Sequence, residues 1–222
     1  MFHFFVNLCI VKVGGILMLE FYLVRHGQTL FNQKDLVQGA CDSPLTKIGR
    51  KQAENLGKNM KDLHFDLCYS SPSERAMDTG NAIASVQGLE MHLDKRLKEM
   101  NFGDLEGDRN GALWSNHATT FEELIEIGWV DRGGENLEMV NQRIYSFFND
   151  MVHQYDNKKI LIASHGMYIM MALKTLNEDE KMAQVLANSQ IENCSVSKLV
   201  YDEGHFKVVF VNDISYREEE NI

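Results

Sequence analysis

Phe21-Tyr22-Leu23-Val24-Arg25-His26-Gly27-Gln28-Thr29 is the stretch that decides the fold, an apolar run that stops at an arginine, a histidine and a glycine. The run is too short for a helix and is closed by Gly27, so it predicts a buried β-strand. Such a strand delivers Arg25 and His26 to its carboxyl end. Open α/β sheets bind their ligands at the carboxyl ends of their strands. We therefore expect a functional site beside His26.

A second predicted strand ends in the same way. Ile160-Leu161-Ile162-Ala163-Ser164-His165-Gly166 is the most apolar run in the chain, and it also stops at a histidine and a glycine. A third strand candidate, Phe65–Tyr69, leads into a helix with Arg75 in its first turn. The helix macrodipole disfavours a cation there, which indicates another reason for Arg75. In a parallel sheet these strand ends share one edge, so His26, Arg75 and His165 are expected to meet.

The other elements alternate between strands and helices. Thr46 is a plausible N-cap for a helix over about residues 47–62, where apolar residues recur at helical spacing. Further expected elements are helices over Glu74–Val86, 137–155 and Gly166–Leu176, another helix after the capping box Asn177–Glu180, a short strand over Leu89–Leu93, and a hairpin of Cys194–Tyr201 with His205–Asn212. This order predicts a three-layer α/β/α fold with a mostly parallel central sheet, in a single domain over residues 18–222.

Composition limits the partners and the compartment. The formal net charge of −10 argues against nucleic acid or an anionic membrane as the main partner. The four cysteines have no paired spacing, which indicates reduced thiols in a cytoplasmic protein. The eight histidines include no His-x-x-x-His or His-x-His pair, so we expect neither a metal centre nor a cofactor. Because the overall charge repels an anionic substrate, particular arginines must create any anion site.

The first 17 residues form an apolar extension with a different character. It has no basic start and no small-residue cleavage site, and Lys12 interrupts it, so it makes a poor secretory signal or membrane span. Gly14-Gly15 lies a few codons before Met18, at the distance expected if it were encoded by a bacterial ribosome-binding site. We favour Met18 as the native initiator and interpret residues 1–17 as a start-site artefact.

The predicted sheet edge has the chemistry of a phosphate pocket. One arginine guanidinium group can bind two phosphate oxygens at once through two parallel N–H···O bonds. Free N–H groups at helix N-termini also bind anions. A neutral imidazole can attack phosphorus and form a phosphohistidine, which divides the transfer into two easier steps. Arg25 and Arg75 disfavour protonation of His26 and His165, and they neutralise the oxygens of the transferred group. This chemistry needs no metal.

The leaving alkoxide also needs a proton. Glu99 follows the short strand and fits better than Asp104 or Glu106 by position. After it, residues 103–135 are irregular and glycine-rich, with Trp114, Phe121 and Trp129 as expected anchors around a short helix near 119–127. A segment of this kind is either a lid over a site or a surface excursion packed by its own aromatic side chains.

Six ordered blocks of sequence carry a family resemblance. They are Arg25-His26-Gly27-Gln28-Thr29 with Asn32, Ser43-Pro44-Leu45-Thr46-x-x-Gly49, Ser70-Ser71-Pro72-x-x-Arg75-Ala76-x-x-Thr79, Leu97-x-Glu99-x-x-Phe102-Gly103-x-Leu105-Glu106-Gly107, Gly133-Gly134-Glu135 and Ser164-His165-Gly166. Together the blocks resemble the histidine phosphatase superfamily, in its cofactor-dependent phosphoglycerate mutase-like branch. The match runs in order from about residue 20 to residue 213.

The resemblance implies a role for each matching residue. His26 corresponds to the phosphorylated nucleophile and Glu99 to the proton donor. Three residues correspond to the phosphate clamp, namely Arg25, Arg75 and His165. The other implied contacts are Asn32 and the backbone N–H of Gly166 with the phosphate, and Gln38-Gly39 on the substrate side.

The family contains both phosphatases and mutases. A mutase must hold a second acidic group and exclude water, and mutases of this branch carry an arginine pair in a longer insertion rich in proline and tyrosine. Here the insertion offers only Arg109 and Arg132, with no proline and several acidic residues. We therefore favour a phosphatase acting on a small phosphorylated metabolite, with a phosphoglycerate mutase primed by 2,3-bisphosphoglycerate as the alternative. A silent phosphate-binding scaffold is a third class, and the oligomeric state stays open, with a homodimer among the alternatives.

Overall fold

The computed structural model describes residues 18–218. The extension predicted at residues 1–17 therefore lies outside the described part of the chain. Among the described residues no helix has both the length and the apolar character needed to cross a membrane.

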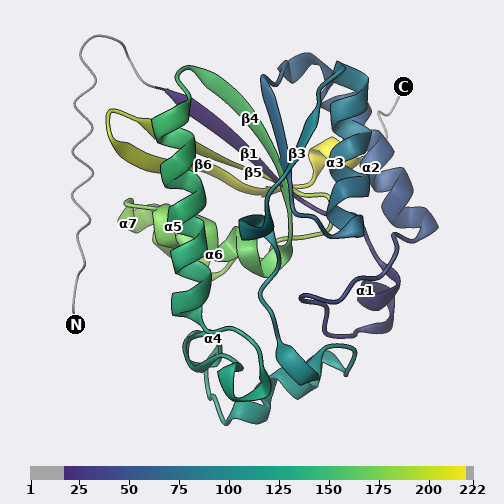
Figure 1. The fold of residues 1–222 in the computed structure, drawn as a ribbon, viewed down its shortest axis with the longest axis vertical. Coiled ribbons are helices and arrows are strands. Elements are labelled where there is room, and N and C mark those ends of the chain that lie inside the picture. The colour runs from purple at the N-terminus through teal and green to yellow at the C-terminus, as the bar shows by residue number, and fades with distance from the viewer. Residues whose placement is uncertain (1–17, 219–222) are drawn as a thin grey trace.

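The centre of the molecule is a six-stranded sheet in the order β3-β2-β4-β1-β5-β6 (Figure 1). Its strands are β1 Leu19–Arg25, β2 Leu67–Ser70, β3 Met91–Leu93, β4 Lys158–Ser164, β5 Val196–Asp202 and β6 His205–Asp213. Strands β1 to β4 pair in parallel, whereas β5 runs antiparallel to both β1 and β6. The predicted α/β fold with a mostly parallel sheet is confirmed.

Helices cover both faces of this sheet (Figure 1). The helices are α1 Leu30–Lys34, α2 Lys47–Asn59, α3 Glu74–Ala84, α4 Phe121–Ile127, α5 Leu137–Gln154, α6 Gly166–Leu176 and α7 Glu180–Ala187. Alternate residues of β1 point to opposite faces, as the two-residue period of a strand requires. Phe21 and Leu23 pack in a core with α5 and α6, and Tyr22 and Val24 pack in a second core with α2 and α3.

Side-chain caps explain where several helices begin. Thr46 Oγ1 accepts the N–H of Gly49 at 3.0 Å and so caps α2, as the sequence predicts. The helix α7 is capped by Asp179, two residues later than the predicted capping box begins. The short helix α1 was not expected within the polar loop 28–43. It forms because Thr29 and Asn32 make a reciprocal capping box at its start.

The segment 103–135 contains α4 and several turns of 3-10 helix, and it lies at one end of the molecule (Figure 1). Of its three predicted anchors, only Trp129 is buried, and it meets the ring of Phe102 with 4.9 Å between centroids. Trp114 and Phe121 are 46% and 37% exposed, so the prediction that they anchor the segment was wrong. Leu124 and Ile125 instead fix α4 to the main core, because they lie on the face of this helix that packs inward, whereas Phe121 at its start does not.

Candidate active site

The register of the sheet brings the two His-Gly motifs together. Arg25, the last residue of β1, lies opposite Ser164, the last residue of β4, and Ser70 of β2 lies opposite Ala163. The next residues of β1 and β4 are therefore His26 and His165, at one edge, with ring centroids 5.3 Å apart. His26 is 3% exposed, and both His165 and Arg75 are fully buried. The expectation that these three residues meet at one sheet edge agrees with the structure.

The backbone around His26 selects its tautomer. Nδ1 of His26 lies 2.8 Å from the carbonyl oxygen of Gly27. Because a carbonyl only accepts, Nδ1 must carry the proton, and Nε2 keeps its lone pair. Gly27 itself has no room for a side chain, since a Cβ would lie 2.5 Å from the carbonyl oxygen of Gly49. The turn after β1 thus leaves one imidazole nitrogen ready to act as a nucleophile.

Burial and charge keep both histidines neutral. Desolvation, followed by the nearby guanidinium groups of Arg75 and Arg25, lowers the pKa of His26 well below its ordinary range. The same causes lower the pKa of His165, with His26 and Arg143 adding to the effect. Cys41 also lies near Arg75, but burial and the Glu106 carboxylate raise the pKa of its thiol to about 11. The thiol is therefore protonated at neutral pH, whereas His26 offers a lone pair.

The guanidinium group of Arg25 is hydrogen-bonded through Nη1 but not through Nε. Its Nη1 donates to the carbonyl of Ile191 at 2.5 Å, while its buried Nε has no partner among the described residues. The guanidinium lies so close to the start of α6 that a Cβ on Gly166 would be 3.2 Å from that Nε. The family motif's glycine at this position therefore makes room for Arg25.

Arg75 is held in the same fashion by the loop that follows α1. Its Nη1 donates to the carbonyl of Cys41 and to Asp42 Oδ1, both at 2.9 Å, and Nη2 donates to the carbonyl of Gly39 at 2.8 Å. Its buried Nε has no partner among residues 18–218. Asp42 Oδ2 also accepts the N–H of Glu74 and so caps α3 in place of Ser73. This carboxylate offsets the unfavourable place of a cation at a helix N-terminus.

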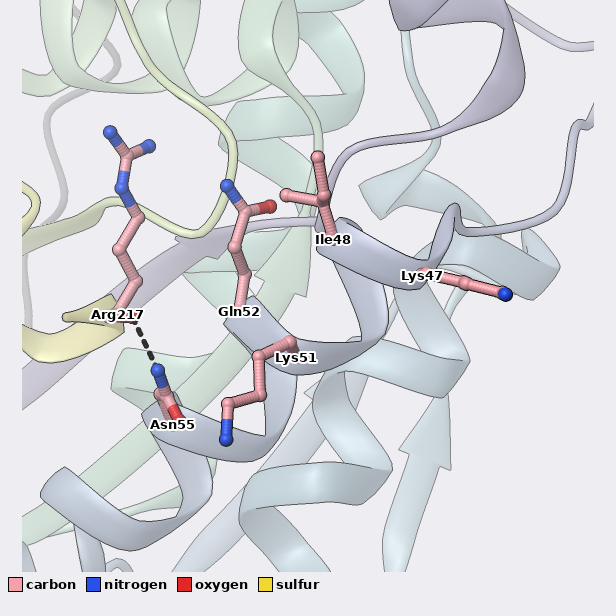
Figure 2. A pocket seen from close by; sticks show the side chains of 6 residues that line it. All are labelled: Lys47, Ile48, Lys51, Gln52, Asn55 and Arg217. Carbon is pink, nitrogen blue, oxygen red and sulfur yellow. Dashed lines mark hydrogen bonds between the residues drawn. The ribbon is translucent and has the colours of Figure 1, made fainter. Parts of the chain in front are cut away.

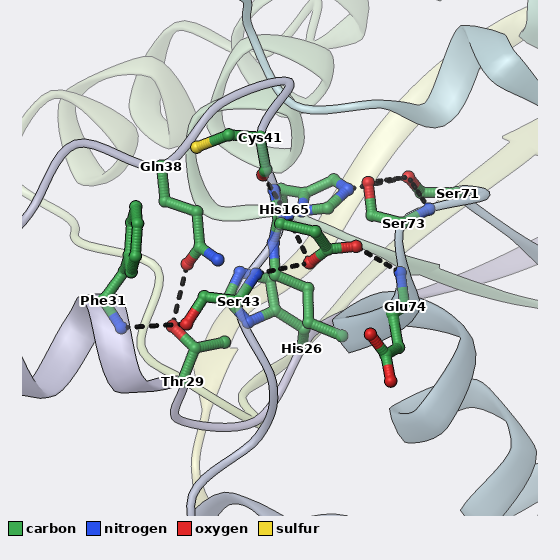
Figure 3. Close-up of polar contacts among 12 residues, drawn as sticks. His26, Thr29, Phe31, Gln38, Cys41, Ser43, Ser71, Ser73, Glu74 and His165 are labelled. Atoms are coloured by element: carbon green, nitrogen blue, oxygen red, sulfur yellow. Dashed lines mark hydrogen bonds and ion pairs between the residues drawn. The ribbon is translucent and has the colours of Figure 1, made fainter. Parts of the chain in front are cut away.

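Gln38 and His165 supply two further buried atoms without a partner. Gln38 Oε1 accepts from Thr29 Oγ1 at 2.8 Å, while its Nε2 is unpaired within the described residues (Figure 3). His165 Nε2 lies 2.8 Å from Ser71 Oγ, and its Nδ1 is unpaired. The one hydroxyl proton of Ser71 can go to this Nε2 or to Ser73 Oγ, 3.3 Å away, and when it goes to Nε2 the proton of His165 is on Nδ1, which can then donate. Buried polar atoms are nearly always hydrogen-bonded, so the unpaired ones around His26 are suited to bind a polar group.

Asn32 and Gly166 lie at the same edge with a donor left over. Asn32 Oδ1 accepts from Thr29 N and from Asn193 Nδ2, each at 3.1 Å, which leaves its Nδ2 for a ligand. At the start of α6, the N–H groups of residues 166–168 have no intrahelical acceptor. Glu99 accepts those of Met167 and Tyr168, and Gly166 N has no acceptor among the described residues. Gly39 differs from these, because it is buried behind Arg75 and contributes its carbonyl.

Glu99 is bonded to the start of the helix α6. Its Oε1 accepts the N–H groups of Met100 and Tyr168 at 2.9 and 2.8 Å, and Oε2 accepts that of Met167 at 3.0 Å. Among residues 18–218, Met167 N is the one donor to Oε2, so this oxygen has a further lone pair for a ligand. The competing acids lie elsewhere: Asp104 is a surface partner of Arg132, and Glu106 accepts the amides of Ala40, Cys41 and Phe102.

Sequence reasoning missed residues that hold others in place. Asp42 and Glu106 fix the loop that binds Arg75. Ser71 orients His165 (Figure 3). All three lie inside or beside the quoted motifs, so motif membership was the available signal. Their partners are distant in sequence, and spacing alone does not show which pairs meet.

A groove of about 390 Å³ lies on α2 (Figure 2). It is lined by Lys47, Ile48, Lys51, Gln52, Asn55 and Arg217. None of these residues contacts His26 or His165, and the lining includes no histidine or cysteine. In residues 18–218 no cluster of three or more histidine, cysteine or acidic side chains is arranged to hold a metal ion.

Fold and site together define an α/β protein that presents a neutral histidine among unpaired donors at the carboxyl edge of its sheet. The model of the histidine phosphatase superfamily (branch 1) matches residues 21–214, and the chain belongs to this family.

The relatives of this chain include proteins named as mutases and a protein named as a phosphatase. A probable phosphoglycerate mutase GpmB of Yersinia pestis (strain Pestoides F) is 32% identical over 188 residues, which cover 84% of this chain and 86% of the relative. The crystal structure of a phosphoglycerate mutase from Bacillus anthracis str. Sterne matches with a TM-score of 0.82 at 29% identity. The match covers 91% of this chain and 96% of the Bacillus chain. A phosphoserine phosphatase from Entamoeba histolytica, in complex with 3-phosphoglyceric acid, has a TM-score of 0.77 at 27% identity, covering 90% and 100%.

Proposed function

We propose that this protein hydrolyses the phosphomonoester of a small metabolite through a phosphohistidine on His26. The observation that carries the proposal is the set of unpaired buried atoms around a neutral imidazole, namely Nε of Arg25 and of Arg75, Nε2 of Gln38 and Nδ1 of His165. A phosphoryl group has three equatorial oxygens that need such donors as charge develops on them. The family to which the chain belongs supports the same chemistry.

In the first step, the lone pair on His26 Nε2 attacks phosphorus and the bond from phosphorus to the ester oxygen breaks. Arg25 and Arg75 stabilise the charge on the equatorial oxygens, with Asn32 and the N–H of Gly166 as further donors. Glu99 in its acid form gives its proton to the departing oxygen, so the product is a neutral alcohol. His26 Nδ1–H remains bonded to Gly27 and spreads the positive charge of the phosphorylated ring.

In the second step, a water molecule attacks the same phosphorus and the bond to His26 Nε2 breaks. The Glu99 carboxylate takes a proton from that water, which restores its acid form. Inorganic phosphate leaves, and His26 returns to its neutral state. Atoms and charges balance over the two steps, with one water consumed for each ester.

The insertion supports hydrolysis over a mutase reaction. A mutase would need free cations there for a second acidic group, but Arg109 Nη1 donates to the carbonyl of Lys34 and Arg132 pairs with Asp104. Both arginines thus already have a partner, at α1 and at the start of the insertion. The alternative, a phosphoglycerate mutase primed by 2,3-bisphosphoglycerate, has its support in the names of the relatives.

The deciding experiment compares 4-nitrophenyl phosphate, 3-phosphoglycerate and 2,3-bisphosphoglycerate as substrates. Release of phosphate that is lost in His26→Ala, together with trapping of a 32P-labelled acid-labile intermediate, is the expected result. Rapid interconversion of phosphoglycerates without phosphate release would establish the mutase instead. Stoichiometric binding without turnover would show a phosphate-binding scaffold.

A further inference from the structure

The Gly133-Gly134-Glu135 motif has no part in the pocket, yet its glutamate forms an ion pair with Arg143 of α5. Arg143 Nε donates to Glu135 Oε1 at 3.0 Å, and Nη2 donates to Oε2 at 3.1 Å. The side chains are only 15% and 18% exposed. Withdrawing two charges from water is costly, and their attraction often does no more than offset this cost. A well-formed pair of this kind therefore points to a role beyond stability.

The remaining donors of Arg143 all go to one short segment. Nη1 donates to the carbonyls of Arg96 and Lys98, at 2.9 and 2.5 Å, and Nη2 donates to the carbonyl of Glu99 at 3.2 Å. A guanidinium has five N–H donors, and these bonds together with those to Glu135 use them all. The group also lies over the ring of Tyr168, 5.1 Å from its centroid. Arg143 is thus fixed on every side.

Glu135 holds the other end of the same segment. Its Oε2 accepts the N–H of Asn101 at 2.9 Å, and its own N–H donates to the carbonyl of Asn101 at 2.8 Å. Residues 98–102 belong to no helix or strand, so no regular ladder of hydrogen bonds supports them. The ion pair therefore supplies, on both sides of Glu99, the bonds that regular structure would otherwise provide.

We infer that Arg143 and Glu135 are positioning residues that hold Glu99 where it can protonate the leaving oxygen of the ester. The inference rests on the proposed function, in which Glu99 is the proton donor. The inference predicts different effects on the hydrolysis of two classes of ester. A 4-nitrophenolate leaves readily without a proton, whereas an alkoxide requires one, so a displaced Glu99 slows alkyl esters selectively.

The test measures kcat/KM for 4-nitrophenyl phosphate and for an alkyl phosphate such as glycerol phosphate, and takes the alkyl-to-aryl ratio. In Arg143→Met and Glu135→Gln the ratio is expected to fall by about tenfold or more, in the same direction as in Glu99→Gln, because general acid catalysis typically contributes a hundredfold or more. Both rates come from one preparation, so partial unfolding lowers them equally and leaves the ratio unchanged.

Arg96→Gln is the matched control. Arg96 also bridges to α5, through Asp150 and Ser146, and it pairs with Asp94, but its side chain does not touch residues 98–101. We expect this variant to keep the wild-type ratio. If Arg143→Met does not fold, Glu135→Gln decides the question, since it keeps the size of the side chain and one amide oxygen.

Three outcomes count against the inference. Equal losses on both esters in Arg143→Met and Glu135→Gln would reduce the pair to a structural role. An unchanged ratio in Glu99→Gln would show that Glu99 is not the donor, while hydrolysis itself would stand. A wild-type protein that releases phosphate from neither ester would overturn the proposed function and this inference with it.

Discussion

Gly166 begins α6 directly beside Arg25, and a side chain at this position would meet the guanidinium. In Gly166→Ala the new Cβ would lie 3.2 Å from Arg25 Nε and 3.3 Å from Cζ, so Arg25 must shift by a few tenths of an ångström. We expect kcat/KM for an aryl phosphate to fall by roughly threefold to tenfold, since small displacements of catalytic groups are costly. The melting temperature should hold or rise, because alanine favours a helix.

Gly111→Ala is the control for this prediction, because a Cβ there meets open space. Equal activity losses in the two variants would show that the loss in Gly166→Ala does not come from contact with Arg25.

At Asp42 the effect of its hydrogen-bond geometry and the effect of its negative charge can be tested separately. Its Oδ1 accepts from Arg75 Nη1 and its Oδ2 accepts the N–H of Glu74. We expect Asp42→Ala to lower kcat/KM by on the order of tenfold, because Arg75 loses an anchor that orients its free Nε edge. Asp42→Asn keeps one acceptor oxygen and should lose less. Steady-state kinetics on both variants provides the check, and a larger loss in the asparagine variant would contradict this account.

At the scale of elements, α1 and α2 frame the loop that holds Arg75. Thr46 Oγ1 accepts the N–H of Gly49 at 3.0 Å and donates to Gln28 Oε1 at 2.8 Å, so it joins the start of α2 to the turn after β1. Thr46→Ala should lower the free energy of unfolding by about 1 kcal/mol, the usual effect of losing an N-cap. Urea denaturation measures this change.

Thr46→Ser keeps the hydroxyl and is expected to stay close to the wild-type stability. If serine and alanine destabilise the protein equally, the methyl group of Thr46 rather than its cap is what matters.

At the scale of the whole molecule, the two neutral histidines couple stability to pH. Burial and the arginines lower the pKa of His26 and of His165 in the folded state, while unfolded histidine titrates near 6.5. As pH falls below about 6.5, the unfolded chain binds protons that the folded protein does not. The free energy of unfolding should therefore fall with decreasing pH, by up to about 1.4 kcal/mol per pH unit for each histidine.

Denaturation curves between pH 7.5 and pH 5 test this coupling. In His165→Asn the contribution of one histidine is absent, so the slope in that window should become shallower. A slope identical to that of the wild type would mean that His165 is not held neutral by the fold.

Much of the fold followed from the sequence, because apolar periodicity and turn residues act locally. The run Phe21–Val24, the cap at Thr46 and the hairpin around residues 202–204 each depend on neighbouring residues, and the structure agrees with all three. The helix α1 was missed because its capping box is short and polar. Trp114 was misassigned because burial of a loop aromatic depends on what packs over it, as Phe102 does over Trp129.

By itself the sequence determined which residue types stand at the ends of the strands, and hence the chemistry available to His26, Arg25, Arg75, Glu99 and His165. Only the tertiary structure decided which donors stay unpaired, that Asp42 anchors Arg75, and that Arg143 with Glu135 supports the segment around Glu99. The physical reason is that these bonds join residues 33 to 44 positions apart, on loops and on α3 and α5, so their partners are set by how these segments pack on the sheet and not by neighbouring residues.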